Sequence, residues 1–318
     1  MRAVVLLLLA ALTTGCSVLS IDLSPRLRPL EEETVEGSGD AKIVLMDLSG
    51  FLSDESTSSL LNLTTPPARV PLLVRVREEL KKATEDPKVK ALVIRINTPG
   101  GTVTAADVIY RELQLFKREK KIPIVAVMMD VAASGGYYVA LAADTIVAHP
   151  TTVTGSIGVI MLTFNAEGLM QKLGVAANAV KSAERKDMGS PFRTMTPEER
   201  AIFQSVIDDL YRQFIAKVID RRKLPDATAR TLGDGRVYTA GQALEHKLVD
   251  RVGYMPDAIE LARAAAGVEK ARVVVYHRPR QYRATYYAES QHSDSIFGAS
   301  ALGALVGPGP KFLYLWMP

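Results

Sequence analysis

Two short glycine-bearing motifs and one lysine hold the residues that could do chemistry. The first motif is NTPGG at residues 97–101, and the second is AASGGYY at residues 132–138. Each motif follows an apolar run typical of a buried strand, so each is expected where a strand turns into a helix. Glycines at such turns leave backbone N–H groups open, and Ser134 lies among them. This pattern is typical of a serine nucleophile beside an oxyanion hole.

The oxyanion donors expected from these motifs are the backbone N–H groups of Gly100 and Gly135. Each donor of this kind lowers a reaction barrier by roughly 3 kcal/mol. Both glycines also fit plain strand-to-helix connections, and a Ser-Gly-Gly sequence occurs in ordinary turns. The second motif is not the G-x-S-x-G elbow of the α/β-hydrolases, because Ala132 stands at its first glycine position.

The candidate general base is Lys186, in the polar loop 182–193. Its local sequence alone is typical of a lysine that is exposed to solvent. A lysine can act as a general base only where burial lowers its pKa towards neutrality, and the sequence does not show burial. The histidines offer no better base, because none is paired with an acid in a way that suggests a triad. They are His149, His246, His277 and His292.

Composition excludes several other classes of function. The formal net charge is +4 with a pI of about 9.0, and no dense Lys/Arg block argues for nucleic-acid binding. No His-Glu-x-x-His motif or Cys/His cluster indicates a metal site, and we expect no cofactor. With 47% hydrophobic residues in 318, the chain can bury a large core.

The N-terminus predicts export. Within residues 1–16, one charged residue precedes an apolar run that is too short to span a bilayer, and the segment ends at Cys16. Small residues before a lone cysteine resemble a bacterial lipobox, in which the cysteine is lipidated, although Thr13 stands where that pattern prefers Leu. The alternative is an ordinary signal peptide that leaves a free cysteine. Cys16 is the only cysteine, so the chain has no internal disulfide.

The remaining chain divides into a flexible tether at residues 17–40, a folded body at 41–278 and an apolar, glycine-rich tail at 279–318. The tail could pack on the body or on a neighbouring subunit, contact a membrane, or occupy an extended substrate groove. Strands and helices alternate along the body, which predicts an α/β fold with mostly parallel strands. Strands are expected at 42–48, 89–96, 123–129, 145–148, from 155, at 248–250 and 272–276, and helices at 72–84, 104–117, 137–143, 167–173, 197–222, 240–246 and 256–266.

From about residue 42 to 276 the chain resembles the SppA-type signal peptide peptidases, a family of serine proteases. The resemblance lies in the two glycine motifs, in GSIGV at 155–159, and in Lys186-Asp187 followed by Ser190-Pro191. It continues in VYTAGQA at 237–243 and in Leu-Val-Asp at 248–250. One departure is Lys247, where the family usually has glycine, and that affects a turn rather than the chemistry.

The resemblance implies a single catalytic domain with the Clp protease/crotonase-like fold, built from repeated strand-strand-helix units. It implies a Ser–Lys dyad with Ser134 as nucleophile and Lys186 as base, Gly100 and Gly135 as oxyanion donors, and Ser156 as a support for the lysine amine. It also implies a ring-like homo-oligomer, in which serine and lysine can come from adjacent subunits.

The implied activity is degradation of cleaved signal peptides or other unfolded peptides after export. A lipid on Cys16 would hold the enzyme in the bacterial cell envelope, facing the periplasm, on the inner or the outer membrane. Three alternatives are a catalytically silent scaffold of the same fold, acyl-CoA chemistry, and a Ser-His-Asp protease of the Clp type. An export signal argues against a CoA enzyme, and residues 137–148 lack the histidine that a Clp-type triad needs.

Overall fold

A nine-stranded sheet forms the centre of the molecule in the computed structural model, which describes residues 28–54, 70–279, 285–288 and 311–317. The strand order is β1-β11-β2-β3-β5-β6-β10, and β7 pairs with β5 and with β9. The strands are β1 (Glu31–Gly37), β2 (Ala41–Ser49), β3 (Val89–Thr98), β5 (Ile124–Ala133), β6 (Thr145–Ala148), β7 (Val153–Gly155), β9 (Val237–Thr239), β10 (Arg251–Val252) and β11 (Ala271–His277).

The central strands are parallel, as the alternation of strands and helices predicted. Every neighbouring pair from β11 to β10 in this order is parallel, and β7 runs parallel to β5. Their near-continuous apolar runs are typical of strands buried on both faces. Because the carboxyl ends of parallel strands meet at one edge, the turns after β3, β5 and β7 are brought together there.

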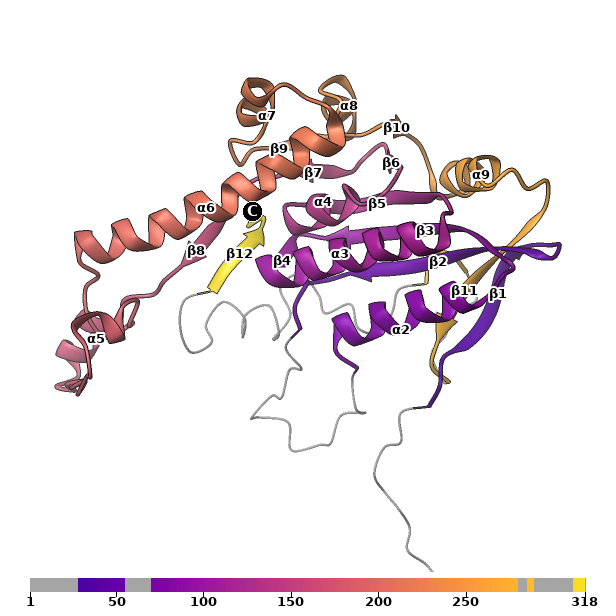
Figure 1. Ribbon diagram of the computed structural model, residues 1–318. Helices are drawn as coiled ribbons and strands as arrows, with labels where there is room; N and C mark the ends of the chain where they lie inside the picture. Colours follow the sequence, from indigo (N-terminus) through magenta and orange to yellow (C-terminus); the bar gives the residue numbers. More distant parts are fainter. Residues whose placement is uncertain (1–27, 55–69, 280–284, 289–310, 318) are drawn as a thin grey trace, which may run out of the picture.

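Helices cover both faces of this sheet (Figure 1). Alternate residues of β2 separate the two cores: Val44 and Met46 belong to the larger cluster, and Ile43 and Leu45 belong to the smaller one. The larger cluster packs against α2 (Leu72–Glu85), α3 (Val103–Lys120) and α4 (Gly135–Ala140), and the smaller one packs against α9 (Met255–Ala265).

A long helix, α6 (Pro197–Arg222), begins at the capping box that the sequence predicted, with Thr196 and Glu199 bonded reciprocally to each other's backbone N–H groups. Residues 163–195, here called the arm, lie before it and contain α5 (Glu167–Lys172) and the 3-10 turn η1 (Glu184–Asp187). No residue from 158 to 198 is buried. Figure 1 shows α5 beside the outer end of α6, away from the sheet. The body is completed by α7 (Asp226–Leu232) and α8 (Ala240–Glu245).

A second, three-stranded sheet joins the apolar tail to the body. β12 (Lys311–Leu315) lies between β4 (Gly100–Thr102) and β8 (Ile160–Leu162) and is antiparallel to both. Leu313 and Tyr314 are each only 1% exposed, so this part of the tail packs into the body.

Three local expectations are corrected by the structure. Within the expected tether, residues 31–37 form β1, which pairs antiparallel with β11 and covers the edge of the sheet. The expected strand at 248–250 is a bend, and the strand follows it as β10. The expected strand from Gly155 is interrupted, because Ser156 has a φ of 49° that no strand can contain.

Among the described ranges, no helix combines the length and apolar character needed to cross a bilayer. Cys16 and the rest of the expected export signal lie outside the described residues.

Candidate active site

Ser134 lies at a strained turn between β5 and α4. It is the N-cap of α4, with φ 52° and ψ −110°, a conformation that side-chain-bearing residues rarely adopt. Its N–H donates to the carbonyl of Gly155 at 2.7 Å, and its own carbonyl accepts from the N–H of Tyr138 at 2.9 Å. Its Oγ is buried and has no hydrogen-bond partner among the described residues. The strain holds the hydroxyl at a fixed point at the carboxyl edge of the sheet.

The glycine turn after β3 lies directly against this serine. A Cβ atom built on Gly100, whose φ is 113°, would lie 2.9 Å from the backbone N of Gly135, so no larger residue fits there. The N–H of Gly100 is occupied, because it donates to Oγ1 of Thr98 at 3.0 Å. The neighbouring N of Gly101 lies 3.3 Å from the point where a Cβ of Gly135 would be. Gly135 begins α4, and the first N–H groups of a helix have no acceptor within it.

Ser156 lies beside Ser134. The parallel pair of Ala133 with Gly155 places the two serines next to each other at the ends of β5 and β7. Ser156 is 8% exposed, and its N–H donates to the carbonyl of Arg236 at 2.8 Å. The structure therefore brings together four of the five residues expected at the catalytic site.

Lys186 is the exception. It lies on η1 in the arm and is exposed to solvent. Since the Ser134 Oγ is buried and unbonded, the lysine amine does not contact it within one chain.

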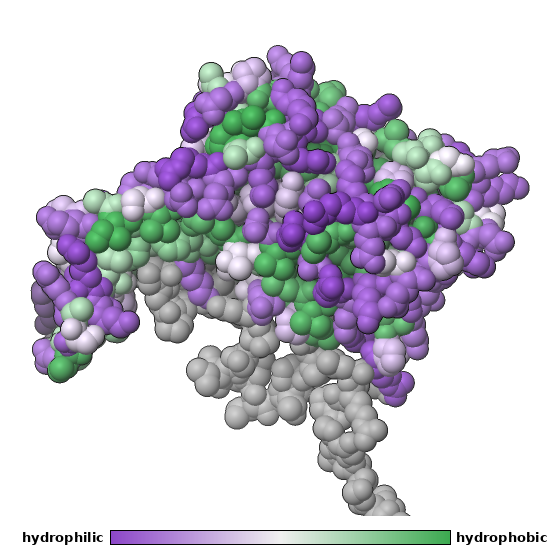
Figure 2. All heavy atoms as spheres, in the orientation of Figure 1, coloured by the Kyte–Doolittle hydropathy of each residue, from purple (hydrophilic) through white to green (hydrophobic). Residues whose placement is uncertain are grey.

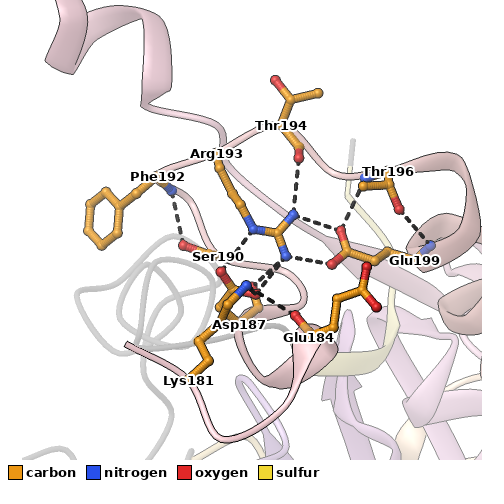
Figure 3. A network of polar contacts seen from close by, with 9 residues as sticks. All are labelled: Lys181, Glu184, Asp187, Ser190, Phe192, Arg193, Thr194, Thr196 and Glu199. Carbon is orange, nitrogen blue, oxygen red and sulfur yellow. Dashed lines mark hydrogen bonds and ion pairs between the residues drawn. The ribbon is translucent and has the colours of Figure 1, made fainter. Parts of the chain in front are cut away.

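The turn that carries Lys186 is held by a network of charges rather than by burial (Figure 3). The guanidinium of Arg193 donates from Nε and Nη2 to the carboxylate of Asp187, at 3.0 and 2.8 Å. It also donates from Nη1 to Oε2 of Glu199 at 2.9 Å, and Lys181 Nζ donates to Asp187 at 2.9 Å. Such two-pronged contacts fix orientation as well as distance. Arg193 thus ties the end of η1 to the first turn of α6.

The network lowers the pKa values of the Asp187 and Glu199 carboxylates. Hydrogen bonds from Arg193, and then from Lys181, hold the pKa of Asp187 well below its ordinary range. Hydrogen bonds from Arg193 and from the backbone of Thr196 lower the pKa of Glu199. Both carboxylates therefore stay ionised through mildly acidic solution.

The C-terminal strand covers the serine and its glycines. The carbonyl oxygen of Tyr314 would lie 1.9 Å from a Cβ on Gly100 and 3.1 Å from one on Gly135, so it fills the space that the missing side chains leave. The N–H of Trp316 donates to the carbonyl of Pro99 at 2.9 Å. The alternation of an antiparallel ladder then sets the carbonyl of Tyr314 opposite the N–H of Gly101. An extended peptide backbone therefore crosses the site.

Two of the histidines have polar partners other than Ser134, and His292 lies outside the described residues. His149 Nδ1 lies 2.9 Å from the hydroxyl of Thr151, and His277 Nε2 lies 3.3 Å from Glu33 near the far edge of the sheet. Within the described part of the chain, no group of three or more His, Cys, Asp or Glu side chains could hold a metal ion.

The strain at Ser134 predicts an unusual order of stabilities. Both Ser134→Ala and Ser134→Gly remove the hydroxyl, but only glycine adopts a positive φ without a steric penalty. We expect the Gly variant to be about 1 kcal/mol more stable than the Ala variant, measured by urea unfolding. Equal stabilities, or a more stable Ala variant, would show that the turn is unstrained.

The charge network predicts how the arm responds to substitution and to acid. Arg193→Ala should speed hydrogen exchange and proteolysis across 184–190 at neutral pH, whereas Arg185→Ala, an exposed arginine of the same turn with no ion pair among the described residues, should not. A carboxylate with a lowered pKa stabilises the fold above its ordinary pKa near 4, and this contribution is lost as pH falls through the lowered value. Protection in the wild type should therefore persist to about pH 4. Equal exchange in both variants would contradict the role of Arg193.

Comparison with known proteins agrees with this geometry. The model of peptidase family S49 matches residues 116–269, and the Clp protease model matches residues 74–154. A putative signal peptide peptidase SppA of Enterococcus faecium is 35% identical over 246 residues, which cover 77% of this chain and 70% of the relative. A putative protease of Synechocystis is 42% identical, over 60% of this chain and 69% of its own length. The chloroplastic serine protease SPPA of Arabidopsis thaliana is 35% identical, over 68% of this chain and 32% of its own length. The chain belongs to peptidase family S49 and is a serine protease.

Proposed function

We propose that the protein is an endopeptidase that cuts extended peptides through a Ser–Lys dyad, with Ser134 as the nucleophile. The observation that carries the proposal is β12, an extended segment held antiparallel between β4 and β8 directly over Ser134. A substrate that enters in the same way gains backbone hydrogen bonds along both neighbouring strands, which is recognition by strand addition. This mode suits unfolded peptides, because they can adopt an extended form.

The oxyanion site consists of backbone N–H groups around the missing side chains. Gly135 supplies one donor. Because Thr98 occupies the N–H of Gly100, Gly101 supplies the second donor in its place. Gly100 then serves by leaving room for the substrate carbonyl. Each donor lowers the barrier by roughly 3 kcal/mol.

The general base is Lys186 of a neighbouring copy of the chain. Its own Ser134 is out of contact, and the arm that carries it exposes large apolar side chains that a second copy would bury. Figure 2 shows apolar side chains gathered along α6 next to the arm. The large apolar residues exposed on the arm are Phe164 (55%), Leu169 (61%), Leu173 (68%), Val175 (54%), Val180 (103%) and Phe192 (52%). Docking would also desolvate the lysine, as a lysine base requires.

The chemical steps follow from this arrangement. Neutral Lys186 takes the proton of Ser134, and the serine Oγ attacks the amide carbonyl. The oxyanion rests on the two N–H groups while the lysine returns the proton to the leaving amine. Water then attacks the acyl-enzyme with the lysine as base again. Ser156, which lies beside Ser134, accepts or donates a hydrogen bond that orients the amine.

The substrates that we propose are cleaved signal peptides and other unfolded peptides after export. One relative is named as a putative signal peptide peptidase, which supports this class. A lipid on Cys16 would hold the enzyme at the periplasmic face of an envelope membrane, close to such peptides. A catalytically silent scaffold is the second candidate, because the lysine is exposed and the serine is covered in the single chain.

Mixing two inactive variants tests the dyad and its subunit origin together. Ser134→Ala and Lys186→Ala should each abolish casein and peptide cleavage while remaining folded. After co-assembly in equal amounts, one quarter of the sites would join an intact serine to an intact lysine, so we expect about a quarter of wild-type activity to return. No recovery would place both groups in one chain. Full activity of Lys186→Ala would refute the dyad, and an inert wild type in its native assembly would favour the scaffold.

The lipid anchor is tested separately. The full chain expressed in a bacterial cell should take up labelled palmitate and sediment with membranes. Cys16→Ser should lose the label and keep its uncleaved N-terminus, while Ser17→Ala, next to it, should behave as the wild type. Label-free, processed wild-type protein would show an ordinary signal peptide instead.

A further inference from the structure

Thr98, the last residue of β3, lies between the two turns that form the proposed oxyanion site. Its side chain is buried, with 0% exposure. Its methyl carbon lies 2.7 Å from the point where a Cβ of Gly136 would be, so the methyl group packs against the first turn of α4. Its hydroxyl bonds to the other turn, at Gly100. One side chain therefore contacts both elements that supply the backbone N–H donors.

The hydroxyl of Thr98 joins the glycine turn to the loop after β2. It donates to the carbonyl of Gly50 and accepts from the N–H of Gly100 at 3.0 Å. The carbonyl oxygen of Gly100 lies 3.1 Å from the same hydroxyl, within reach of its proton. A threonine hydroxyl has one proton and two lone pairs, so it can serve a donor and an acceptor at once. Both polar backbone groups of Gly100 thus lie against one side chain.

The position of Gly100 sets the direction of the N–H of Gly101. The Gly100 carbonyl and the Gly101 N–H belong to one peptide group, which is planar and trans, so they point in opposite directions. The N–H of Leu52 donates to that carbonyl at 2.9 Å. The Gly101 N–H is therefore turned away from Leu52. The nitrogen that carries it lies 3.3 Å from the point where a Cβ of Gly135 would be, next to the other donor.

We propose that Thr98 is a positioning residue for the oxyanion site: its hydroxyl holds the peptide between Gly100 and Gly101 so that the Gly101 N–H meets the oxyanion. The inference rests on the proposed function, since it takes Gly101 and Gly135 as the donors. Donors that are fixed in advance stabilise a developing charge best, because they do not reorient during the reaction. Without the hydroxyl, the N–H of Gly100 loses its acceptor, and the turn is free to rotate toward another one.

The expected effect is on kcat rather than on substrate binding. Thr98→Val removes the hydroxyl and keeps the branching at Cβ. Loss of one oxyanion donor lowers kcat by roughly 100- to 1000-fold, and a donor that is misdirected rather than lost should cost less, about 10- to 100-fold. KM should stay within about 3-fold of wild type, because the contact acts in the transition state. Thr98→Ser retains the hydroxyl, so its kcat should lie within about 3-fold of wild type.

Thr152→Val is the matched control. Thr152 is also 0% exposed, and its hydroxyl donates to the backbone carbonyl of Met128 at 3.0 Å, so the substitution removes the same kind of buried hydrogen bond. This hydroxyl serves β5 instead of the turn at Gly100. The two valine variants should lose similar stability toward urea, within about 1 kcal/mol of each other. The kcat of Thr152→Val should nevertheless stay within about 3-fold of wild type.

A peptide aldehyde distinguishes positioning from a merely structural role. The test uses the full chain in its native assembly, a quenched peptide that the wild type cuts, and the aldehyde and primary alcohol made from the part before the cut. Oγ of Ser134 bonds to the aldehyde carbon, the C=O π electrons move to the oxygen, and the serine proton passes to the base. The adduct therefore carries an oxyanion, which the alcohol cannot form. In Thr98→Val the affinity for the aldehyde should fall about 10- to 100-fold, and the affinity for the alcohol should stay within about 3-fold.

The outcomes decide on Thr98 separately from the peptidase. Equal losses of kcat in Thr98→Val and Thr152→Val overturn the positioning role and leave the Ser134-dependent peptidase standing. Aldehyde and alcohol affinities that fall together in Thr98→Val do the same. If Thr98→Val does not fold, Thr98→Cys is compared with Thr98→Ser, because a thiol is a weak hydrogen-bonding group in place of the hydroxyl. A kcat at least about 5-fold lower in the Cys variant supports the role, and equal kcat overturns it.

An inert wild type would refute the proposed function, and the ligands would then decide on Thr98 alone, made from a casein fragment and measured against Ser134→Ala as the blank. Aldehyde affinity at least about 10-fold above that of the alcohol in the wild type, and lost in Thr98→Val, supports the positioning role. The same advantage in both proteins, or none in the wild type, refutes it.

Discussion

The close approach of three backbones is the constraint on which the site depends. The turn at Gly100 and Gly101, the start of α4 at Gly135 and an extended strand all meet within a space that a single Cβ would fill. Only glycine allows this contact, and only a parallel sheet brings the two turns to one edge. The strained φ of Ser134 belongs to the same arrangement, because a relaxed turn would carry the hydroxyl away from the gap.

Much of the fold was predictable because its signals are local. Buried parallel strands have continuous apolar runs, and the glycine motifs that follow β3 and β5 are visible in the sequence. The first residue of α6 could be predicted from the sequence, because Thr196 and Glu199 form a capping box and Pro197 stands at the first helical position. The proximity of Ser134 and Ser156 also followed from the sequence, once the resemblance to a protease family had linked the two motifs.

The features that escaped prediction depend on contacts between distant segments. β1 looked like a tether because its run of glutamates is polar, and its strand form comes from pairing with β11 at the other end of the chain. The occupied N–H of Gly100 depends on one rotamer of Thr98, which no motif encodes. For β12, the continuous apolar run in KFLYL was a usable signal, but its place beside β4 was only one of several open positions.

If substrates enter as proposed, the position of β12 also makes it a tethered competitor for the groove. A strand that is joined covalently to the groove keeps the same local concentration however dilute the enzyme becomes. An incoming peptide would then have to displace β12, by abundance or by a better fit to the groove. The turnover rate would then rise only above a threshold concentration of peptide, and it would stay low when exported fragments are scarce. In that case the enzyme would spare the folded proteins around it without needing a separate inhibitor.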